Sequence, residues 1–229
     1  IMIISTLSPF SVSAVSGTPI STADEFLAMD PHGEYYLTAD ITLPRTYYKP
    51  FEGTINGNGK TLTISAPIFE DFSGKVENLT IAGKVVKTDE DASAFTLTSS
   101  KGFEAINCTN NANVTVMGYA KYASGFVGTC YNATVKFTNC VNNGAIASET
   151  SNTANYPHAG GIAGYTQNGY TDFEFIGCVN NAEISSVGGK EVRAGGIVGS
   201  VYAASAEYKF DQCVAIGELK SSCFSPIHT

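Results

Sequence analysis

The sequence predicts an all-β fold, a β-solenoid in which each coil lays its strands in parallel on those of the coil before. Three observations lead to it. One apolar column recurs at steps of 29, 32, 38 and 35 residues, at Leu79, Cys108, Cys140, Cys178 and Cys213. A second motif recurs in phase with the first. The composition, with 23 Gly in 229 residues and 15% charged residues, is typical of strands and turns and excludes a helical bundle.

The cysteine column belongs to a motif whose clearest copies, residues 137–146 and 175–184, agree at six of ten positions. Further copies span 105–114 and 210–219. Residues 76–85 resemble a more diverged copy of the motif, with Leu79 in the cysteine column. Cysteine is small and apolar, so this column suits an inward-facing ladder. The Asn pairs 110–111, 142–143 and 180–181 are expected where the chain turns a corner, because Asn tolerates left-handed backbone and stacked Asn side chains can bond one another.

The second motif has four copies, residues 92–95, 123–126, 159–162 and 194–197, and its last position is Phe or Ile. Between the motifs, segments 117–122, 148–158 and 186–193 vary in length, which is typical of loops on a rigid scaffold. Each repeat shows about two clear strands. A β-propeller has a similar period but needs four antiparallel strands in each blade, so the solenoid is the favoured interpretation.

The chain before the repeats predicts a leader and a cap. Residues 1–17 combine an apolar run with a Val12-Ser13-Ala14 pattern and look like the rear of a secretory signal. Thr22 and Glu25 have capping-box spacing, which predicts a helix over 22–29 that covers the first coil. Strands are expected at 35–38, 41–43, 53–55 and 60–64.

This pattern divides the chain into an N-terminal cap at 18–50, coils at 51–220 and a tail at 221–229. We expect the tail to continue in a longer parent protein. After the leader, no segment approaches about 18 continuous apolar residues, so no membrane span is expected.

The repeats also resemble a known family. Gly160-Gly161-Ile162-Ala163-Gly164 and Gly195-Gly196-Ile197-Val198-Gly199, alternating with Asn-Cys-x-Asn-Asn-Gly-x-Ile, look like the GLUG-type repeats of bacterial surface proteins. Residues 36–41 and 51–62 are similar to the opening coil of many right-handed parallel β-helices of the pectate-lyase-like superfold. The resemblance covers about residues 35–220, and residues 86–107 depart from it. It implies a secreted or surface-attached protein, often with an adhesive or glycan-related role.

Candidate chemistry is sparse. The net charge of 13 − 21 = −8, with only Arg45 and Arg193 as guanidinium groups, argues against nucleic acid as a partner. The densest acidic group, around Asp89 and Asp91, is a weak candidate for a cation site, although a solvated loop is the simpler interpretation. The six cysteines lack Cys-x-x-Cys spacing, which argues against structural zinc. No cofactor is expected, and no metal site beyond that weak candidate. The ladder thiols are expected to stay reduced, and the states of Cys130 and Cys223 are left open.

Two functional hypotheses follow. The favoured one is a non-catalytic secreted or cell-surface module, a β-helical stalk or adhesin segment that presents side loops to an extracellular glycan or a surface protein. Its candidate binding residues lie in or beside those loops: Tyr119, Tyr122, Tyr156, Tyr165, Tyr170, His158 and Arg193. Arg193 is at the position equivalent to His158, so the two are expected to stack on one loop edge.

The alternative is a carbohydrate-active enzyme, a polysaccharide lyase or glycoside hydrolase, with grouped acids and a base. At least three Asp, Glu, His, Lys or Arg side chains in one groove would favour it.

Overall fold

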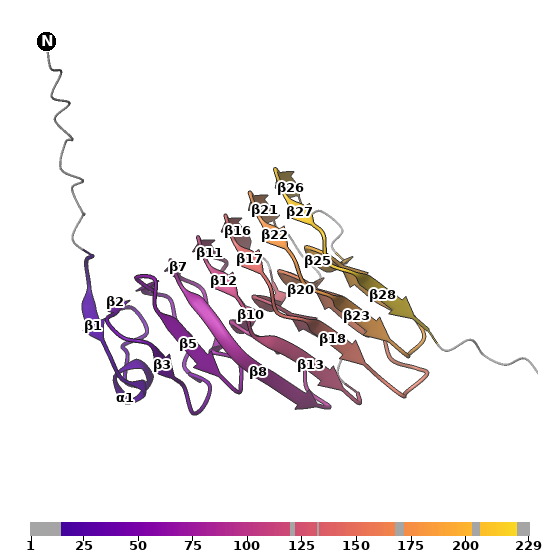
Figure 1. Ribbon diagram of the computed structural model, residues 1–229, viewed down its shortest axis with the longest axis horizontal. Helices are drawn as coiled ribbons and strands as arrows, with labels where there is room; N and C mark the ends of the chain where they lie inside the picture. Colours follow the sequence, from indigo (N-terminus) through magenta and orange to yellow (C-terminus); the bar gives the residue numbers. More distant parts are fainter. Residues whose placement is uncertain (1–14, 120–121, 132, 168–171, 203–206, 224–229) are drawn as a thin grey trace, which may run out of the picture.

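The computed structural model describes residues 15–119, 122–131, 133–167, 172–202 and 207–223. Fourteen of the seventeen residues interpreted as a leader lie outside these ranges. Strands make up nearly all of the regular secondary structure in the described chain, which confirms the all-β class, and its successive repeats lie side by side along the long axis (Figure 1). No helix among the described residues is long and apolar enough to cross a membrane.

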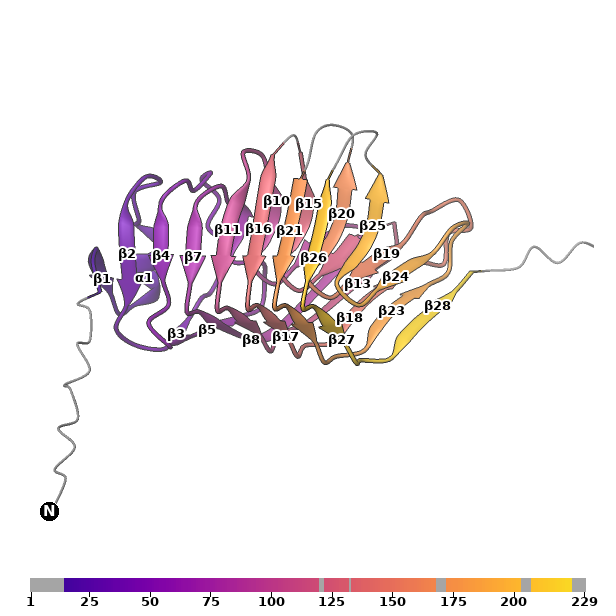
Figure 2. The ribbon, with the colours of Figure 1, turned by 90° about the horizontal axis from the view of Figure 1, so that it is seen from above.

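The strands form four sheets, and an eight-stranded sheet runs the whole length of the molecule (Figure 2). In spatial order its strands are β1 (Thr18–Ile20), β2 (Glu34–Leu37), β4 (Thr54–Asn56), β7 (Lys75–Glu77), β11 (Phe103–Ile106), β16 (Thr134–Thr138), β21 (Asp172–Ile176) and β26 (Tyr208–Asp211). A five-stranded sheet holds β6 (Phe69–Asp71), β10 (Thr96–Ser99), β15 (Val127–Cys130), β20 (Ala163–Gln167) and β25 (Val198–Tyr202).

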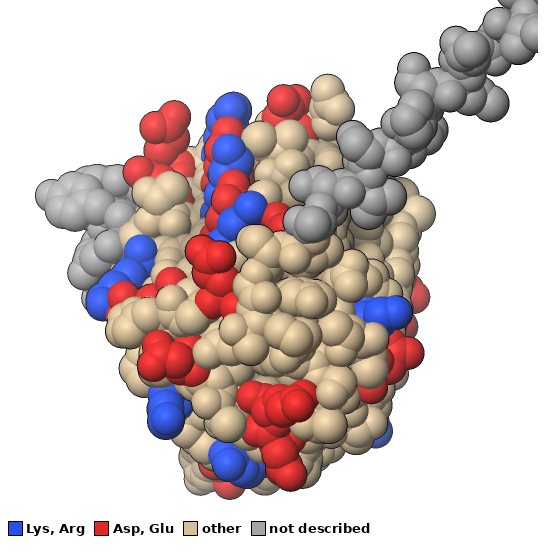
Figure 3. All heavy atoms as spheres, turned by 90° about the vertical axis from the view of Figure 1, so that its left-hand side faces the viewer, with Lys and Arg blue, Asp and Glu red and all other residues tan. Residues whose placement is uncertain are grey.

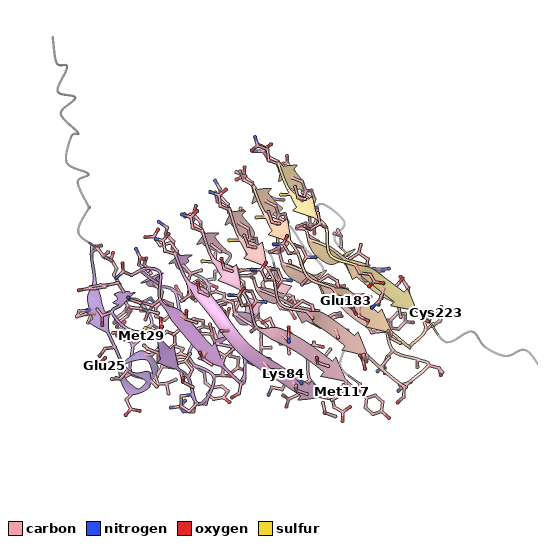
Figure 4. The ribbon with its side chains drawn as sticks, viewed as in Figure 1. Glu25, Met29, Lys84, Met117, Glu183 and Cys223 are labelled. Atoms are coloured by element: carbon pink, nitrogen blue, oxygen red, sulfur yellow. The ribbon has the colours of Figure 1, made fainter. Side chains whose placement is uncertain are left out.

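The other two sheets carry the repeated motifs. The eleven-stranded sheet contains β3 (Ile41–Thr42), β5 (Thr61–Ile64), β8 (Thr80–Thr88), β12 (Thr109–Asn110), β13 (Asn113–Met117), β17 (Val141–Asn142), β18 (Ile146–Glu149), β22 (Val179–Asn180), β23 (Ile184–Val187), β27 (Val214–Ala215) and β28 (Leu219–Ser222). The four-stranded sheet contains β9 (Ala92–Ser93), β14 (Tyr122–Ser124), β19 (His158–Gly160) and β24 (Arg193–Gly195). Lys84 and Met117 are exposed residues of the eleven-stranded sheet, and exposed Glu183 directly precedes β23 (Figure 4).

The strand register follows the repeat alignment. Every strand pair in the described residues is parallel, and each strand pairs with its equivalent one repeat away, as β16 does with β21 and β14 with β19. This pairing rules out the antiparallel blades of a propeller. A repeat contributes five strands, for example β16 to β20, rather than the two that the sequence shows clearly. The missed strands include two-residue segments such as β17, which are too short to show an alternating pattern.

The predicted helix is present but shorter. α1 spans Ala23–Leu27, and Thr22 and Glu25 form the expected capping box: the Thr22 hydroxyl accepts from the Glu25 N–H at 3.2 Å. The helix ends at Ala28 because the Asp30-Pro31 stretch cannot continue it. It lies at the N-terminal end of the stack (Figure 1), where Phe26 is fully buried with its ring 5.8 Å from that of Phe69.

Buried asparagines form a hydrogen-bonded ladder across three repeats. Asn110, Asn142 and Asn180 are each 0% exposed. Asn110 Nδ2 donates to Asn142 Oδ1 at 2.7 Å, and Asn142 Nδ2 donates to Asn180 Oδ1 at 2.7 Å. The same Nδ2 atoms also donate to the backbone carbonyls of Ala112 and Gly144, each at 3.0 Å. The ladder satisfies amides that would otherwise be costly to bury.

The expectation that these Asn pairs adopt left-handed backbone is wrong. The chain does bend there, between β12 and β13, but the side chain supports the bend and none of the six residues has a positive φ. Left-handed backbone instead occurs one residue before the cysteine column, at Asn78 (φ 54°), Asn107 (φ 53°), Asn139 (φ 53°), Gly177 (φ 61°) and Gln212 (φ 53°). The turn needed there selects Asn or Gly at four of five positions.

The cysteine column is an interior row. Leu79, Cys108, Cys140 and Cys178 are at most 1% exposed, and Cys213 is half-buried because the last described repeat has a neighbour on one side only. The backbone bonds Val141 N to Cys108 O and Val179 N to Cys140 O, both 2.9 Å, hold consecutive repeats in register at this column. All six cysteines are free thiols, with Cys130 buried and Cys223 exposed.

The outer face of the eight-stranded sheet carries a row of alternating charge. Lys75, Glu104, Lys136, Glu174 and Lys209 are register partners in successive strands. Blue and red spheres alternate in a row at the upper centre of Figure 3. Glu174 lies between Lys136 and Lys209, at 3.1 Å and 2.5 Å from their Nζ atoms. Opposite charges on neighbouring parallel strands favour the in-register arrangement over a one-repeat slip.

Candidate functional site

A groove on the five-stranded sheet is the best candidate for a binding site. Its volume is 480 Å³, within the range of about 300–1,000 Å³ usual for small-molecule sites. The lining residues come from four successive repeats: Thr46, Tyr48, Pro67, Glu70, Lys87, Glu90, Asp91, Leu97, Thr98, Thr129 and Tyr131. Tyr48 is 62% exposed and Tyr131 38% exposed, so both rings offer surface to a ligand.

Strand register builds the polar floor of the groove. Thr98 of β10 is the register partner of Thr129 in β15 and of Asp71 in β6. Glu70 precedes Asp71, and its backbone carbonyl accepts from the Thr98 hydroxyl at 3.0 Å. Because β6, β10 and β15 pair in one sheet, these side chains are held at fixed spacing before any ligand arrives.

The acidic side chains of the groove do not converge on one point. Glu90 forms an ion pair with Lys87 at 2.8 Å, while Asp91 Oδ1 accepts from the Tyr122 N–H at 2.9 Å. In the described part of the chain, no three His, Cys, Asp or Glu side chains lie close enough together to hold a metal ion.

Asp89, the second residue of the weak candidate cation site, binds the backbone of the next repeat. Its Oδ1 accepts from the Tyr119 N–H at 2.7 Å, and its own backbone is left-handed, with φ 62°. Asp89 and Asp91 thus each accept a backbone hydrogen bond from the next repeat, which explains a pair of acids two residues apart without a cation.

An aromatic cluster lies beside the groove. The rings of Tyr122 and Tyr165 are stacked, with centroids 4.4 Å apart and planes at 3°. The His158 ring lies 5.6 Å from Tyr122 and 5.5 Å from Tyr165. Burial raises the pKa of the Tyr122 phenol, with further contributions from Tyr165 and Asp91. Asp91 therefore links the groove to the cluster through the backbone of Tyr122.

His158 and Arg193 are register partners, in β19 and β24. They do not share an exposed loop edge, however, because His158 is only 4% exposed, packed against the two tyrosine rings. Arg193 is half-buried; its guanidinium donates to Ser200 Oγ at 2.5 Å and pairs with Glu191. These contacts leave His158 little surface for a ligand.

The remaining predicted tyrosines are dispersed. Tyr119 is 65% exposed and Tyr156 is 39% exposed, and neither lines the groove. Tyr170 lies outside the described residues. The structure thus brings Tyr122, Tyr165 and His158 together, with Arg193 on the strand next to His158.

The sequence analysis did not identify Tyr48, Tyr131 or Glu70 as site residues. Glu70 has a detectable signal, since it lies between buried Phe69 and half-buried Asp71 and must face outward from a strand. Tyr48 and Tyr131 have no such signal. Each follows a buried residue, Tyr47 or Cys130, but lies at the end of a strand or bridge, where the alternation of buried and exposed residues stops. Which outer face is hollow depends on how the repeats stack.

Comparisons with known proteins bear on the fold. No family model matches the chain, and no curated protein sequence matches it. Among solved structures, the chain is similar to a protein from Bacteroides ovatus described as a "putative immunoglobulin A1 protease". The TM-score is 0.52 at 15% sequence identity, over 91% of this chain and 86% of that one. At this identity the likeness shows a shared fold, an all-β stack of parallel strands.

Proposed function

We propose that the chain is a non-catalytic module of a secreted or cell-surface protein, a right-handed parallel β-helix that binds an extracellular glycan. In this proposal α1 caps the first coil. The parallel pairing of equivalent strands along the whole stack supports the β-helix. The burial of Phe26 against Phe69 supports α1 as its cap. The GLUG-like motifs support an address outside the cytoplasm.

The groove that Tyr48 and Tyr131 help to line is the observation that carries the binding role. It combines exposed aromatic rings with hydroxyl and carboxylate groups on a rigid sheet, which is the combination that a sugar needs. A surface-protein partner is less favoured because the groove is small and polar, whereas protein interfaces have an apolar core over a larger area.

One observation favours the rival, a carbohydrate-active enzyme. Glu70, Lys87, Glu90 and Asp91 line the same groove, so more than three charged side chains share it. However, Glu90 is paired with Lys87, and Asp91 is engaged with the Tyr122 backbone. A glycoside hydrolase needs one carboxyl group held protonated and a second one free to attack or to activate water. These contacts make a binding site the better interpretation.

The test is a screen of the purified protein against a panel of neutral and acidic polysaccharides, with and without calcium. We expect retardation by at least one polysaccharide in affinity electrophoresis and no new reducing ends or unsaturated products. Turnover that disappears in the Glu70→Gln variant, or in the Asp89→Asn/Asp91→Asn double variant, would show that the protein is a carbohydrate-active enzyme and contradict the non-catalytic role. Absence of both binding and turnover would leave the module without a glycan partner and contradict the proposal.

A further inference from the structure

The end of the stack opposite α1 exposes strand edges together with apolar side chains. β25, β26, β27 and β28 lie at this end, each at the edge of its sheet in the described part of the chain (Figure 1). Phe210 and Leu219 are both 51% exposed, whereas their register partners one repeat earlier, Phe175 and Ile184, are fully buried. The interior rows thus end on apolar groups that a further strand can cover.

The apolar surface continues onto the outer side of the last repeat. Ile216 is 72% exposed, and its N–H donates to the Asn180 carbonyl at 2.9 Å, which fixes its position in the repeat. The equivalent residue is an exposed asparagine in each of the three preceding repeats, at Asn111, Asn143 and Asn181. An isoleucine therefore replaces asparagine at a position that faces water in those repeats.

The backbone of β26 is arranged to pair with a copy of itself. The Glu207 and Asp211 carbonyls accept from the N–H groups of Phe173 and Gly177, at 2.9 and 2.8 Å, so both residues direct their backbone groups toward β21. Alternate residues of a strand direct these groups to opposite edges, and Phe210 therefore directs its N–H and C=O to the open edge. Two antiparallel β26 strands can exchange both N–H···O bonds at Phe210.

The same register pairs opposite charges. When Phe210 lies opposite Phe210 of a second copy, Lys209 lies opposite Asp211 of that copy, at a non-hydrogen-bonded position where the Cα atoms are about 4.5 Å apart. Both side chains are on the outer face, because Phe210 between them stacks inward on Phe175. Moving the two-fold axis by one residue along the strand would oppose two Lys209 or two Asp211 side chains. Charge thus selects the register centred on Phe210.

Lys209 can serve both partners. Its ammonium group lies 2.5 Å from Glu174 Oε1 in the same chain. An ammonium group carries three N–H donors, so this contact leaves donors for Asp211 of a second copy.

The other end of the same sheet is not suited to such pairing. The Ile20 carbonyl accepts from the Thr38 N–H at 2.8 Å, so Ile20 faces β2 and its neighbour Pro19 faces the open edge of β1. Proline has no N–H to donate, and on an edge strand it hinders pairing with another sheet. α1 lies at this end as well (Figure 1). A head-to-tail row of copies is therefore disfavoured.

We propose that the β26 end of the stack binds a second copy of this chain, with the two β26 strands antiparallel about a two-fold axis at Phe210. Phe210 and Leu219 of each copy become covered, and Lys209 pairs with Asp211 across the interface. The same surface is used by both copies, so the assembly closes as a dimer. The groove is formed by other strands, and the inference does not depend on the proposed glycan binding.

The experiment is sedimentation velocity of the 229-residue chain, from about 1 μM to about 100 μM and under reducing conditions, because Cys223 is exposed. We expect the mass to rise from that of one chain to that of two, with no larger species. Lys209→Asp and Asp211→Lys each oppose like charges, and each should weaken association by at least about tenfold.

The double variant Lys209→Asp/Asp211→Lys restores opposite charges with the signs exchanged and should recover most of the affinity. It also lacks the contact of Lys209 with Glu174, so recovery can come only from the interface. Lys84→Asp is the matched control, since it makes the same charge change at an exposed position of β8, and it should leave association unchanged. Circular dichroism spectra identical to that of the unmodified chain will show that the variants fold.

A single-chain mass at every concentration would overturn the inference. Assemblies larger than two chains would also overturn it, because they require a second binding surface. A dimer that both single variants leave intact, or that the double variant fails to restore, would show that β26 does not pair in this register and would equally overturn it. Binding of polysaccharides by the groove is a separate measurement, which none of these results affects.

Discussion

Asn180 packs directly against Gly161, a residue of the preceding repeat. A Cβ on Gly161 would lie 2.8 Å from Asn180 Oδ1 and 2.0 Å from the Gly196 carbonyl oxygen. The same holds one repeat earlier, where a Cβ on Gly125 would lie 2.8 Å from Asn142 Oδ1. The two sequence motifs are therefore two sides of one contact: the Asn ladder of one motif requires the glycine column of the other.

Gly161→Ala should destabilise the chain. The added methyl group meets backbone and an amide that two hydrogen bonds hold in place, and overpacking of this kind costs about 1–3 kcal/mol. Thermal or urea unfolding followed by circular dichroism will measure it. Gly59→Ala is the control, since its Cβ would meet nothing within 4 Å and only its backbone, at φ +70°, is strained. A larger loss at Gly59 than at Gly161 would contradict the packing argument.

Asn142→Ala should lower the free energy of unfolding more than Asn143→Ala does. It removes the central member of the buried ladder and leaves Asn110 Nδ2 and Asn180 Oδ1 each without one partner, for a loss of about 2–4 kcal/mol. Asn143→Ala breaks the exposed ladder that Asn143 forms with Asn111 and Asn181, where water replaces the lost bonds, and should cost under about 1 kcal/mol. Urea unfolding of both variants gives the comparison, and equal losses would mean that burial does not matter here.

Cys178→Asp should place an unpaired charge in the interior column and cost at least about 3 kcal/mol. Cys223→Asp, at an exposed position, should leave the melting temperature nearly unchanged. An unchanged melting temperature in the Cys178→Asp variant would mean that the cysteine column faces solvent.

Thiol reactivity tests the same column without mutation. The exposed Cys223 should react first with an aromatic disulfide reagent in the native state, and Cys213 more slowly, because partial burial raises the pKa of its thiol. Burial also raises the pKa of Cys130, so this thiol and the three buried ladder thiols should react only after unfolding. Fast native-state reaction of more than two thiols would contradict the burial.

The charge row predicts loss of stability in acid. Hydrogen bonds from Lys209 and Lys136 lower the pKa of Glu174 below its usual value of 4.5 in the folded chain. The stabilisation is therefore complete above pH 4.5 and is lost as the pH falls through the lower, folded-state pKa. Glu174→Gln should melt at a lower temperature than the unmodified chain at pH 7, and the difference should vanish in strong acid. A difference that grows on acidification would reverse the sign and contradict the pairing.

The repeats made much of the fold predictable. The Ala123, Ala159 and Ala194 column and the Val114, Ile146 and Ile184 column are register partners as aligned, because a parallel stack turns sequence period directly into spatial neighbours. The left-handed backbone lies at Asn139 and not at the Asn142-Asn143 pair three residues later, and the sequence does not separate the two because both positions favour Asn for different reasons.

The candidate site was far less predictable. Tyr48, Glu70 and Tyr131 come from different repeats and are placed on one groove only by the Tyr47–Phe69 bridge and the pairing of β6, β10 and β15. Tyr122 and Tyr165 were singled out from their loops, yet their stacked pair depends on a contact between two sheets. The repeat period predicts which residues align along the stack. It does not predict which side chains from different sheets meet on the outer surface.

Parallel, in-register stacking of the repeats is the claim on which the groove, the ladders and the charge row all depend. Nitroxide labels at Asn143→Cys and Asn181→Cys, with Cys213 and Cys223 replaced by Ser, test it by electron paramagnetic resonance. The two residues flank register partners, with Cα atoms about 4.8 Å apart in neighbouring strands, so strong dipolar broadening is expected. Labels at Asn111→Cys and Asn181→Cys, two strands apart, should broaden less. Spectra for Asn143 and Asn181 no broader than those of single labels would contradict the stacked arrangement.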